Sequence, residues 1–308
     1  MFASDSLKDR TVFITGGGTG LGRSMAVRFA ELGGAVFLVA RREEPLREAA
    51  KEIAAKGGKA SFATADVRDA AAVEAAVDAA ERALGPVDTL VNNAAGNFLA
   101  RTETLSANAF GSVVDIVLKG TFHCTTALAR RWIAANRPGT VLNIVTTYAA
   151  SGAGSGFVVP SACAKAGVLA MTRSLAVEWA KHGIRLNAIA PGPFPTEGAW
   201  SRILPNKEWE QAMLAKHPMH RFGTHGELAD LAVYLIAPGS EYVNGECVTI
   251  DGGQWLRGAG QFNELVDLPE ETWEAMEAAR KARKGELKTG AGRRNGLPIP
   301  RASIESKL

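Results

Sequence analysis

A glycine-rich stretch near the N-terminus has the composition of a turn that holds phosphate groups. The letters TGGGTGLG occupy residues 15–22, between a predicted strand over 12–15 and a predicted helix over 20–32. Glycine lets the backbone turn sharply and approach a diphosphate closely, and the free N–H groups of a helix N-terminus attract its charge. The stretch therefore predicts a nucleotide-binding site, whereas the same letters outside a strand–turn–helix context would indicate only a turn.

Two arginines follow the second predicted strand, at the position that decides which nucleotide is bound. That strand covers residues 35–40, and Arg41 and Arg42 come directly after it. Enzymes that use NAD place an acidic residue here for the ribose 2′-hydroxyl, whereas guanidinium groups suit a 2′-phosphate. The pair favours NADP(H) as the cofactor. The alternative is a solvated helix start in which both arginines pair with Glu43 and Glu44.

Three further motifs each follow a predicted strand. NNAAG occupies residues 92–96, Pro191-Gly192 follows the sixth strand, and DGG occupies residues 251–253. With the first glycine stretch, these motifs over residues 8–255 resemble the short-chain dehydrogenase/reductase family. The resemblance implies a doubly wound sheet that binds a nicotinamide dinucleotide at the carboxyl ends of its strands.

The same resemblance implies which residues hold the cofactor. Asp66 and Val67 match the adenine contact of the family, and Thr196 matches its nicotinamide carboxamide contact. By motif match, the full set is Thr15, Gly16, Gly18, Gly20, Leu21, Arg41, Arg42, Asp66, Val67, Asn93, Ala94, Gly96, Lys165, Pro191, Gly192 and Thr196.

The catalytic helix of this chain departs from the family. Most members carry Tyr-x-x-x-Lys there, and the lysine makes the phenol a better proton donor to a carbonyl oxygen. Here residues 161–165 read SACAK, so Ser161 stands in place of the tyrosine and Lys165 keeps the same helical face. An aliphatic hydroxyl is far too weak an acid for that role. The usual upstream serine is missing as well, with Thr146 in its neighbourhood.

Two explanations compete for this departure. Either the chain is a non-catalytic NADP-binding protein, or its reaction needs no strong acid at that place. Hydride addition to a conjugated thioester fits the second explanation, because the negative charge then moves to a distant thioester oxygen. Hydrogen-bond donors stabilise such an oxygen without full proton transfer. Carbon takes up its proton in a separate step.

The departures have a pattern of their own, in four segments. NNAAGNF at 92–98, GSGFVVPS at 154–161, PGP at 191–193 and GQFNE at 260–264 resemble 2,4-dienoyl-CoA reductases, particularly the mitochondrial type. The resemblance implies NADPH-dependent reduction of 2,4-dienoyl-CoA thioesters in the degradation of unsaturated fatty acids, with hydride added to the distal diene carbon. The alternative within the family is a trans-2-enoyl-CoA or carbonyl reductase.

This second resemblance also implies catalytic roles. Tyr148 and Asn97 hold the thioester oxygen, Ser161 assists in place of the family tyrosine, and Lys165 binds the nicotinamide ribose. The segment between Tyr148 and Ser161 is longer than in the mitochondrial pattern, which leaves the placement of Tyr148 to the structure. The residues implied for the substrate are Asn97, Phe98, Tyr148, Phe157 and Ser161.

Each of these residues also has a structural interpretation. Tyr148 could pack as a loop aromatic, Asn97 could brace a turn, and Ser161 could be the N-cap of its helix. Lys119 could reach the site or be a solvated helical lysine. The histidines show no metal-ligand spacing, so we interpret them as surface or packing residues and expect no metal; they are His123, His182, His217, His220 and His225.

The elements that must position these residues alternate between strands and helices. Apolar runs predict strands buried on both faces, at 12–15, 35–40, 60–65, 89–91, 141–145, 185–190 and 247–250. Longer amphipathic patterns predict helices at 20–32, 43–56, 69–84, 106–135, 161–182, 227–236 and 270–283. This alternation predicts an α/β fold, a doubly wound, Rossmann-like parallel sheet with helices on both sides.

We expect a single domain with a C-terminal extension. The dinucleotide-binding catalytic domain covers residues 1–258, and a proline-rich stretch within it predicts a lid over about 194–223. Such a lid would close over the acyl chain and exclude water. The extension covers residues 259–308, and its last ~25 residues are expected to be mobile.

Composition excludes several classes of function. The 308 residues are 46% apolar and 22% charged, close to globular averages, and three scattered cysteines suit a reducing compartment. The chain opens without a signal-peptide pattern and has no apolar run of the ~20 residues that span a bilayer, so we expect no membrane. The net charge of +3 comes with no groove-reading motif, so we expect no nucleic-acid partner.

Assembly and location follow from the resemblance and from the last residues. The expected partner is an acyl-CoA substrate, and the helices over 106–135 and 161–182 resemble those that pair subunits in the family, which implies a homotetramer. The final tripeptide Ser306-Lys307-Leu308 matches a peroxisomal address. We expect a cytoplasmic protein, with the peroxisome as the alternative if the source is eukaryotic.

Overall fold

The chain folds around a seven-stranded parallel sheet with the strand order β3-β2-β1-β4-β5-β6-β7. The computed structural model describes residues 2–151, 155–196, 206–259 and 262–289. The strands are β1 (Thr11–Thr15), β2 (Ala35–Ala40), β3 (Lys59–Thr64), β4 (Thr89–Asn92), β5 (Gly139–Ile144), β6 (Ile184–Pro191) and β7 (Cys247–Ile250). The order reverses direction between β1 and β4, which confirms the predicted doubly wound fold.

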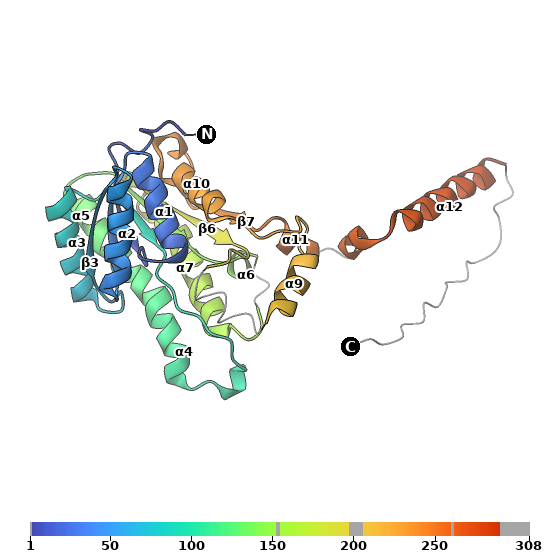
Figure 1. Cartoon of the computed structure of the whole chain (residues 1–308), viewed down its shortest axis with the longest axis horizontal. Coiled ribbons are helices and arrows are strands. Elements are labelled where there is room, and N and C mark those ends of the chain that lie inside the picture. Colours follow the sequence, from blue (N-terminus) through green and yellow to red (C-terminus); the bar gives the residue numbers. More distant parts are fainter. Residues whose placement is uncertain (1, 152–154, 197–205, 260–261, 290–308) are drawn as a thin grey trace. The chain divides into compact units, whose positions relative to one another are not determined.

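Helices cover both faces of this sheet (Figure 1). In the described part of the first unit they are α1 (Gly20–Glu31), α2 (Glu43–Ala55), α3 (Ala70–Leu84), α4 (Ala107–Val114), α5 (Gly120–Ala134), α6 (Thr147–Ala150), α7 (Val159–Glu178), α9 (Lys207–Ala215) and α10 (His225–Ile236). Helices α1, α2 and α10 pack in one apolar cluster, and α3 and α5 pack in another. The central strands are buried on both sides for this reason, as their continuous apolar runs predict.

The predicted helix over 106–135 is wrong in one respect, because it is interrupted. Helix α4 ends at Val114, a π-helical turn η2 covers Asp115–Lys119, and α5 begins at Gly120. A Cβ atom on Gly120 would lie 2.5 Å from Val67 Cγ2, so only glycine allows this close approach. A π turn changes which side chains face the core, and such turns are frequent at functional sites.

Contacts divide the chain into two units, residues 1–256 and residues 257–308. Helix α11 (Gln254–Ala259) spans that division. The described part of the second unit also holds η5 (Asn263–Asp267) and α12 (Glu270–Thr289), which extends beyond the predicted end at 283. Residues 197–205 of the expected lid and residues 290–308, with the terminal tripeptide, lie outside the described residues. None of the described helices is long and apolar enough to cross a membrane.

Candidate active site

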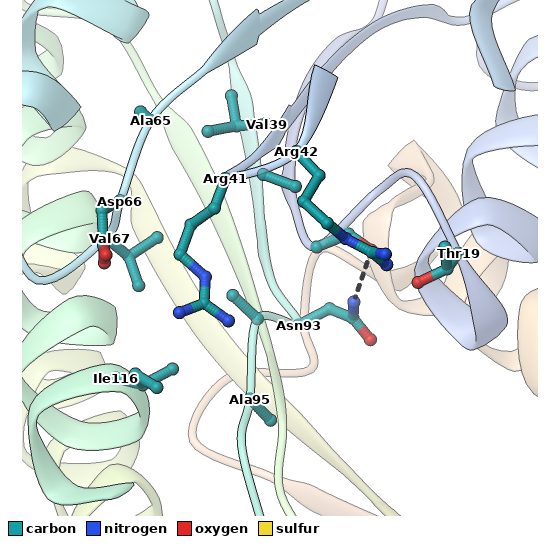
Figure 2. Close-up of a pocket in the computed structure, with 13 residues that line it drawn as sticks. Thr19, Val39, Arg41, Arg42, Ala65, Asp66, Val67, Asn93, Ala95 and Ile116 are labelled. Atoms are coloured by element: carbon teal, nitrogen blue, oxygen red, sulfur yellow. Dashed lines mark hydrogen bonds between the residues drawn. The ribbon is translucent and has the colours of Figure 1, made fainter. Parts of the chain in front are cut away.

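A cavity of about 880 Å³ opens at the carboxyl ends of β1, β2 and β4, where the strand order reverses. This switch point is where open α/β sheets bind their ligands. Figure 2 shows side chains from several strand ends converging on it. The lining residues are Gly16, Thr19, Val39, Ala40, Arg41, Arg42, Ala65, Asp66, Val67, Asn93, Ala94, Ala95 and Ile116.

The glycine stretch forms a tight turn between β1 and α1. Gly16 has a φ of +67° and Gly20 a φ of +53°, a backbone region that other residues rarely adopt. A Cβ atom on Gly16 would lie 2.8 Å from Asn93 Nδ2. The turn is held by the loop after β4, because the amides of Asn93 and Ala94 donate to Thr15 Oγ1 at 3.1 and 3.0 Å.

Arg41 and Arg42 both direct their guanidinium groups into the cavity (Figure 2). The alternative interpretation, in which they pair with Glu43 and Glu44, is wrong. Those two carboxylates pair with Arg47 one turn further along α2, the Glu44 pair at 2.8 Å. The Glu43 and Glu44 carboxylates are therefore engaged by Arg47 on the helix surface. The guanidinium groups of Arg41 and Arg42 line the cavity without pairing with them.

Asp66 and Val67 line this cavity to the left of the Arg41 side chain in Figure 2. The Asp66 carboxylate accepts hydrogen bonds from the backbone N–H and the guanidinium of Arg68. These bonds, with a smaller effect of the Arg41 charge, hold the pKa of Asp66 below its usual range, so the carboxylate stays ionised. Ile116 of the π turn completes this wall, with its Cδ1 atom 3.4 Å from where a Cβ on Gly96 would lie.

These features fit a nicotinamide dinucleotide. The glycine turn packs so closely that added Cβ atoms would meet neighbouring protein atoms. It leads into the N-terminus of α1, where free N–H groups suit a diphosphate. Two cationic side chains face the same cavity from the end of β2. Asp66 supplies an ionised acceptor at its far wall.

Tyr148 and Ser161 meet beside this cofactor site. Tyr148 lies on the four-residue helix α6, directly after β5, and its hydroxyl is 3.0 Å from Ser161 Oγ. Ser161 is 3% exposed and lies in the first turn of α7, whose N-cap is Val158. Ser161 is therefore not the N-cap that one interpretation expected, and Tyr148 is held by this bond. Thr146, the residue in the neighbourhood of the missing serine, is the N-cap residue of α6.

Lys165 lies one turn further along α7 and is 5% exposed. Its ammonium group donates to the carbonyl oxygen of Ile144, the last residue of β5. Burial disfavours the charged form and lowers the pKa of Lys165 to about 8. The structure thus brings Tyr148, Ser161 and Lys165 together at the end of one strand.

Two loops, after β4 and before α7, carry the other residues that the resemblance implies for the substrate. Asn97 is exposed, and its Oδ1 accepts from the Phe98 amide at 2.9 Å, a bond that braces the turn. The Ala100 amide donates to the Phe157 carbonyl at 3.0 Å, so the loop after β4 is joined to the loop before α7. Phe157 has a φ of +65° and a side chain that is 62% exposed.

The segment after β6 completes the site. The Gly192 amide donates to the Ile250 carbonyl at 2.9 Å, and a Cβ on Gly192 would lie 2.6 Å from Asp251 Cβ. Thr196 Cγ2 lies 3.3 Å from where a Cβ on Gly20 would be, so this side chain packs on the glycine turn.

Sequence reasoning missed several residues around the site. Ile116 lines the cavity from the π turn, which no sequence pattern predicts. Lys119 pairs with Asp115 at 2.7 Å on the helix surface. His225 contacts both Ser24 and Pro195, although the histidines were interpreted as surface or packing residues. Among the described residues, no cluster of three or more His, Cys, Asp or Glu side chains could hold a metal ion.

The fold, the glycine turn and the cavity at the switch point define an oxidoreductase that uses a nicotinamide dinucleotide. Residues 16–254 match the model of a family described as enoyl-(acyl carrier protein) reductase. The chain belongs to the short-chain dehydrogenase/reductase family, as its motifs indicated.

Curated relatives share most of the chain. It is 47% identical over 289 residues to an uncharacterized oxidoreductase of Caenorhabditis elegans, covering 92% of each chain. It is 45% identical to a probable 2,4-dienoyl-CoA reductase of Bacillus subtilis, named (2E)-enoyl-CoA-producing, covering 81% of this chain and 98% of that one. It is 38% identical to a peroxisomal 2,4-dienoyl-CoA reductase of Rattus norvegicus, named (3E)-enoyl-CoA-producing, covering 87% and 91%.

Solved structures agree with this assignment. A short chain dehydrogenase from Bacillus anthracis matches with a TM-score of 0.73 at 42% identity, covering 80% of this chain and 97% of that one. A gluconate 5-dehydrogenase from Burkholderia cenocepacia, in complex with NADP and tartrate, matches with a TM-score of 0.75 at 31% identity, covering 82% and 98%.

Proposed function

We propose that this oxidoreductase reduces 2,4-dienoyl-CoA thioesters with NADPH in the degradation of unsaturated fatty acids. The observation that carries the proposal is the 3.0 Å contact between the Tyr148 hydroxyl and Ser161 Oγ, one helical turn before buried Lys165. It holds a phenol beside the position where most of the family carries its catalytic tyrosine. Two curated relatives named 2,4-dienoyl-CoA reductase support the substrate class.

NADPH is the proposed cofactor because of Arg41 and Arg42. Both guanidinium groups face the cavity, while Glu43 and Glu44 pair with Arg47. A 2′-phosphate at the end of β2 would accept charge-assisted hydrogen bonds from the two arginines. The 2′-hydroxyl of NADH offers no such charge.

Three side chains of this chain have different proposed roles in binding the thioester oxygen. The Tyr148 hydroxyl and Ser161 Oγ share a hydrogen bond in which either oxygen can donate. With Ser161 as the donor, the phenolic hydrogen is available to the thioester oxygen. The proposed second donor is Asn97 Nδ2, the role that the motif resemblance implies; Asn97 Oδ1 accepts from the Phe98 amide, which leaves the amide N–H groups for this role. Two neutral donors stabilise the developing negative charge without giving up a proton.

Lys165 holds the nicotinamide ribose through its buried ammonium group, which Ile144 orients from β5. When bound, NADPH supplies the hydride that adds to the distal diene carbon. The electrons of the diene then shift toward the thioester oxygen, where Tyr148 and Asn97 bind the dienolate. Water or a nearby group protonates this dienolate on carbon, and the thioester carbonyl re-forms.

The carbon that takes the proton decides the product. Protonation next to the thioester leaves the double bond in the (3E) position, and protonation two carbons further leaves it at (2E). The names of the Bacillus subtilis and Rattus norvegicus relatives differ in this respect. Reduction in deuterated water, followed by NMR of the product, assigns the position for this chain.

The proposal is tested by following NADPH oxidation with three acyl-CoA substrates. We expect turnover with 2,4-dienoyl-CoA that exceeds turnover with trans-2-enoyl-CoA and with 3-ketoacyl-CoA by at least tenfold. Faster reduction of either comparison substrate would replace the proposal by an enoyl or carbonyl reductase. Tight NADPH binding without turnover of any thioester would identify a non-catalytic NADP-binding protein.

We also propose a homotetramer in which α4, α5 and α7 pair the subunits. Large apolar side chains stand exposed on these helices in the single chain, at Phe110, Phe122 and Val177. A contiguous exposed apolar patch marks a protein interface, and the proposal requires that these side chains be covered by another subunit. Sedimentation velocity of the full chain measures the assembly, and a monomer would contradict this part of the proposal.

A further inference from the structure

His225 connects two segments of the site that are far apart in sequence. Its Nδ1 lies 2.8 Å from Ser24 Oγ in the first half of α1, and its Nε2 lies 2.7 Å from the Pro195 carbonyl oxygen after β6. The ring is half-buried at the first turn of α10, which lies beside α1 (Figure 1). Both nitrogens of the imidazole therefore have a partner.

The partners fix which nitrogen carries the proton. A carbonyl oxygen only accepts, so Nε2 must donate to Pro195. In the neutral ring Nδ1 is then the acceptor, and the Ser24 hydroxyl donates to it. The Gly20 carbonyl oxygen lies 3.1 Å from Ser24 Oγ and competes with Nδ1 for the one hydroxyl hydrogen. The contacts of Nδ1 and Nε2 together hold the ring in one orientation.

The bond to Pro195 acts on the next residue, Thr196. The Thr196 side chain packs against Gly20, with Cγ2 at 3.3 Å from where a Cβ would be. Gly20 belongs to the turn at the N-terminus of α1, where a diphosphate would bind. His225 therefore holds Thr196 from one side while the glycine turn supports it from the other.

We propose that His225 is a positioning residue for the cofactor, which sets the place of Thr196 relative to the glycine turn. The role rests on the proposed function, in which NADPH is the cofactor, and on the family resemblance, which implies that Thr196 contacts the nicotinamide carboxamide. The glycine-turn motif does not itself require a histidine at the start of α10. The arrangement depends instead on how α10 packs against α1 and the segment after β6.

The same pair of helices offers a matched control. Arg28 of α1 and Asp230 of α10 form an ion pair at 2.7 Å, five residues along from His225. This ion pair joins α1 to α10 but does not include the segment after β6. Asp230→Asn therefore loosens the helix pair without touching Pro195.

Two substitutions at position 225 separate the two hydrogen bonds. His225→Gln keeps a donor near the place of Nε2, toward Pro195, and His225→Asn keeps an acceptor near the place of Nδ1, toward Ser24. We expect His225→Asn and His225→Ala to weaken NADPH binding by about 5- to 10-fold, the effect of one lost hydrogen bond. We expect His225→Gln and Asp230→Asn to stay within about twofold of the wild type.

The measurements are the dissociation constant for NADPH, from the change in its fluorescence, and the thermal unfolding of each variant. Normal NADPH binding by His225→Asn would overturn the inference. Equal loss of binding in the Gln, Asn and Asp230→Asn variants, in step with their unfolding temperatures, would also overturn it, because the role would then be structural.

The outcome is separable from the fate of the proposed function. A wild-type chain that binds NADPH but reduces no dienoyl-CoA, with weak binding by His225→Asn, keeps the inference and refutes the function. If the wild-type chain reduces dienoyl-CoA and His225→Asn binds NADPH normally, the proposed function stands and the inference about His225 is refuted. If the wild type binds no NADPH, both fail.

Discussion

The two halves of the active site are built from different parts of the polypeptide. The cofactor half consists mainly of backbone, a glycine turn after β1 held by the loop after β4. The proposed substrate half consists of side chains on short elements, such as the four-residue helix α6 that carries Tyr148. A diphosphate is bound by N–H groups that every residue has, whereas a developing oxyanion needs hydroxyl or amide groups at chosen points.

This difference separates what each half requires of the sequence. The backbone turn tolerates few residues other than glycine at its positive φ angles, whatever the substrate is. In the substrate half, the loss of a phenol at position 161 is matched by a phenol at position 148, bonded to the serine that replaced it. The predictions below test whether the two halves act as separately as this comparison implies.

The largest effect is expected from Tyr148→Phe. Removing one donor to a developing oxyanion lowers kcat by about 100- to 1000-fold. NADPH affinity should stay within about twofold, because the Tyr148 hydroxyl bonds to Ser161 and not to a residue that lines the cofactor cavity. Tyr242, which is fully exposed, provides the control substitution Tyr242→Phe. Wild-type turnover by Tyr148→Phe would remove this residue from the mechanism.

The next effect concerns the cofactor half alone. Replacing Arg41 and Arg42 by alanine should weaken NADPH binding by about 30-fold, since hydrogen bonds to charged groups contribute about 1.5–3 kcal/mol. NADH binding should change little. Arg47→Ala is the matched control, because Arg47 carries the same charge but pairs with Glu43 and Glu44. An equal loss of NADPH and NADH affinity would contradict a 2′-phosphate site.

A smaller effect links the halves through Lys165. Its pKa is lowered to about 8 in the folded chain, below the value near 10.4 of an unfolded lysine. At pH values between about 8 and 10.4, position 165 carries more bound protons in the unfolded chain than in the folded chain. The free energy of unfolding therefore increases as the pH rises through this range. Without nucleotide, the wild type should gain about 1 kcal/mol over Lys165→Met between pH 8 and 9. Urea unfolding at both pH values measures it, and parallel changes in the two proteins would refute the buried-amine interpretation.

The smallest expected effect is at Phe157, where two substitutions distinguish the cost of backbone strain from the loss of the side-chain ring. Phe157 has a φ of +65°, which costs a residue with a Cβ about 1 kcal/mol. Phe157→Gly should therefore be more stable than Phe157→Ala by about 0.5–1 kcal/mol. Both variants should raise KM for long acyl-CoA substrates equally, because both lose the ring. Equal stability of the two variants would show that the loop relaxes around position 157.

The cofactor half could largely be predicted from the sequence, because its backbone conformation requires glycine at particular positions, and these glycines are recognisable in the sequence. The strand over 35–40 and the strand over 247–250 have the predicted bounds, and Arg41 and Arg42 point into the predicted cavity. The glycines at positions 16 and 20 have the positive φ angles that such a turn requires.

The substrate half could be predicted only in part, because side-chain positions depend on tertiary packing. Tyr148 could be named by resemblance, but its bond to Ser161 depends on where α6 and α7 begin. The π turn that carries Ile116 into the cavity has no sequence signal, since its residues are ordinary helix formers. His225 was missed because its partners are 201 and 30 positions away along the chain.

The bond between the Ala100 amide and the Phe157 carbonyl has a consequence for how this enzyme could change. Because the bond uses only main-chain atoms, it survives replacement of the exposed side chains at Leu99 and Phe157. Substitutions at these two positions can therefore change the exposed surface of both loops while the hydrogen bond that joins the loops is kept.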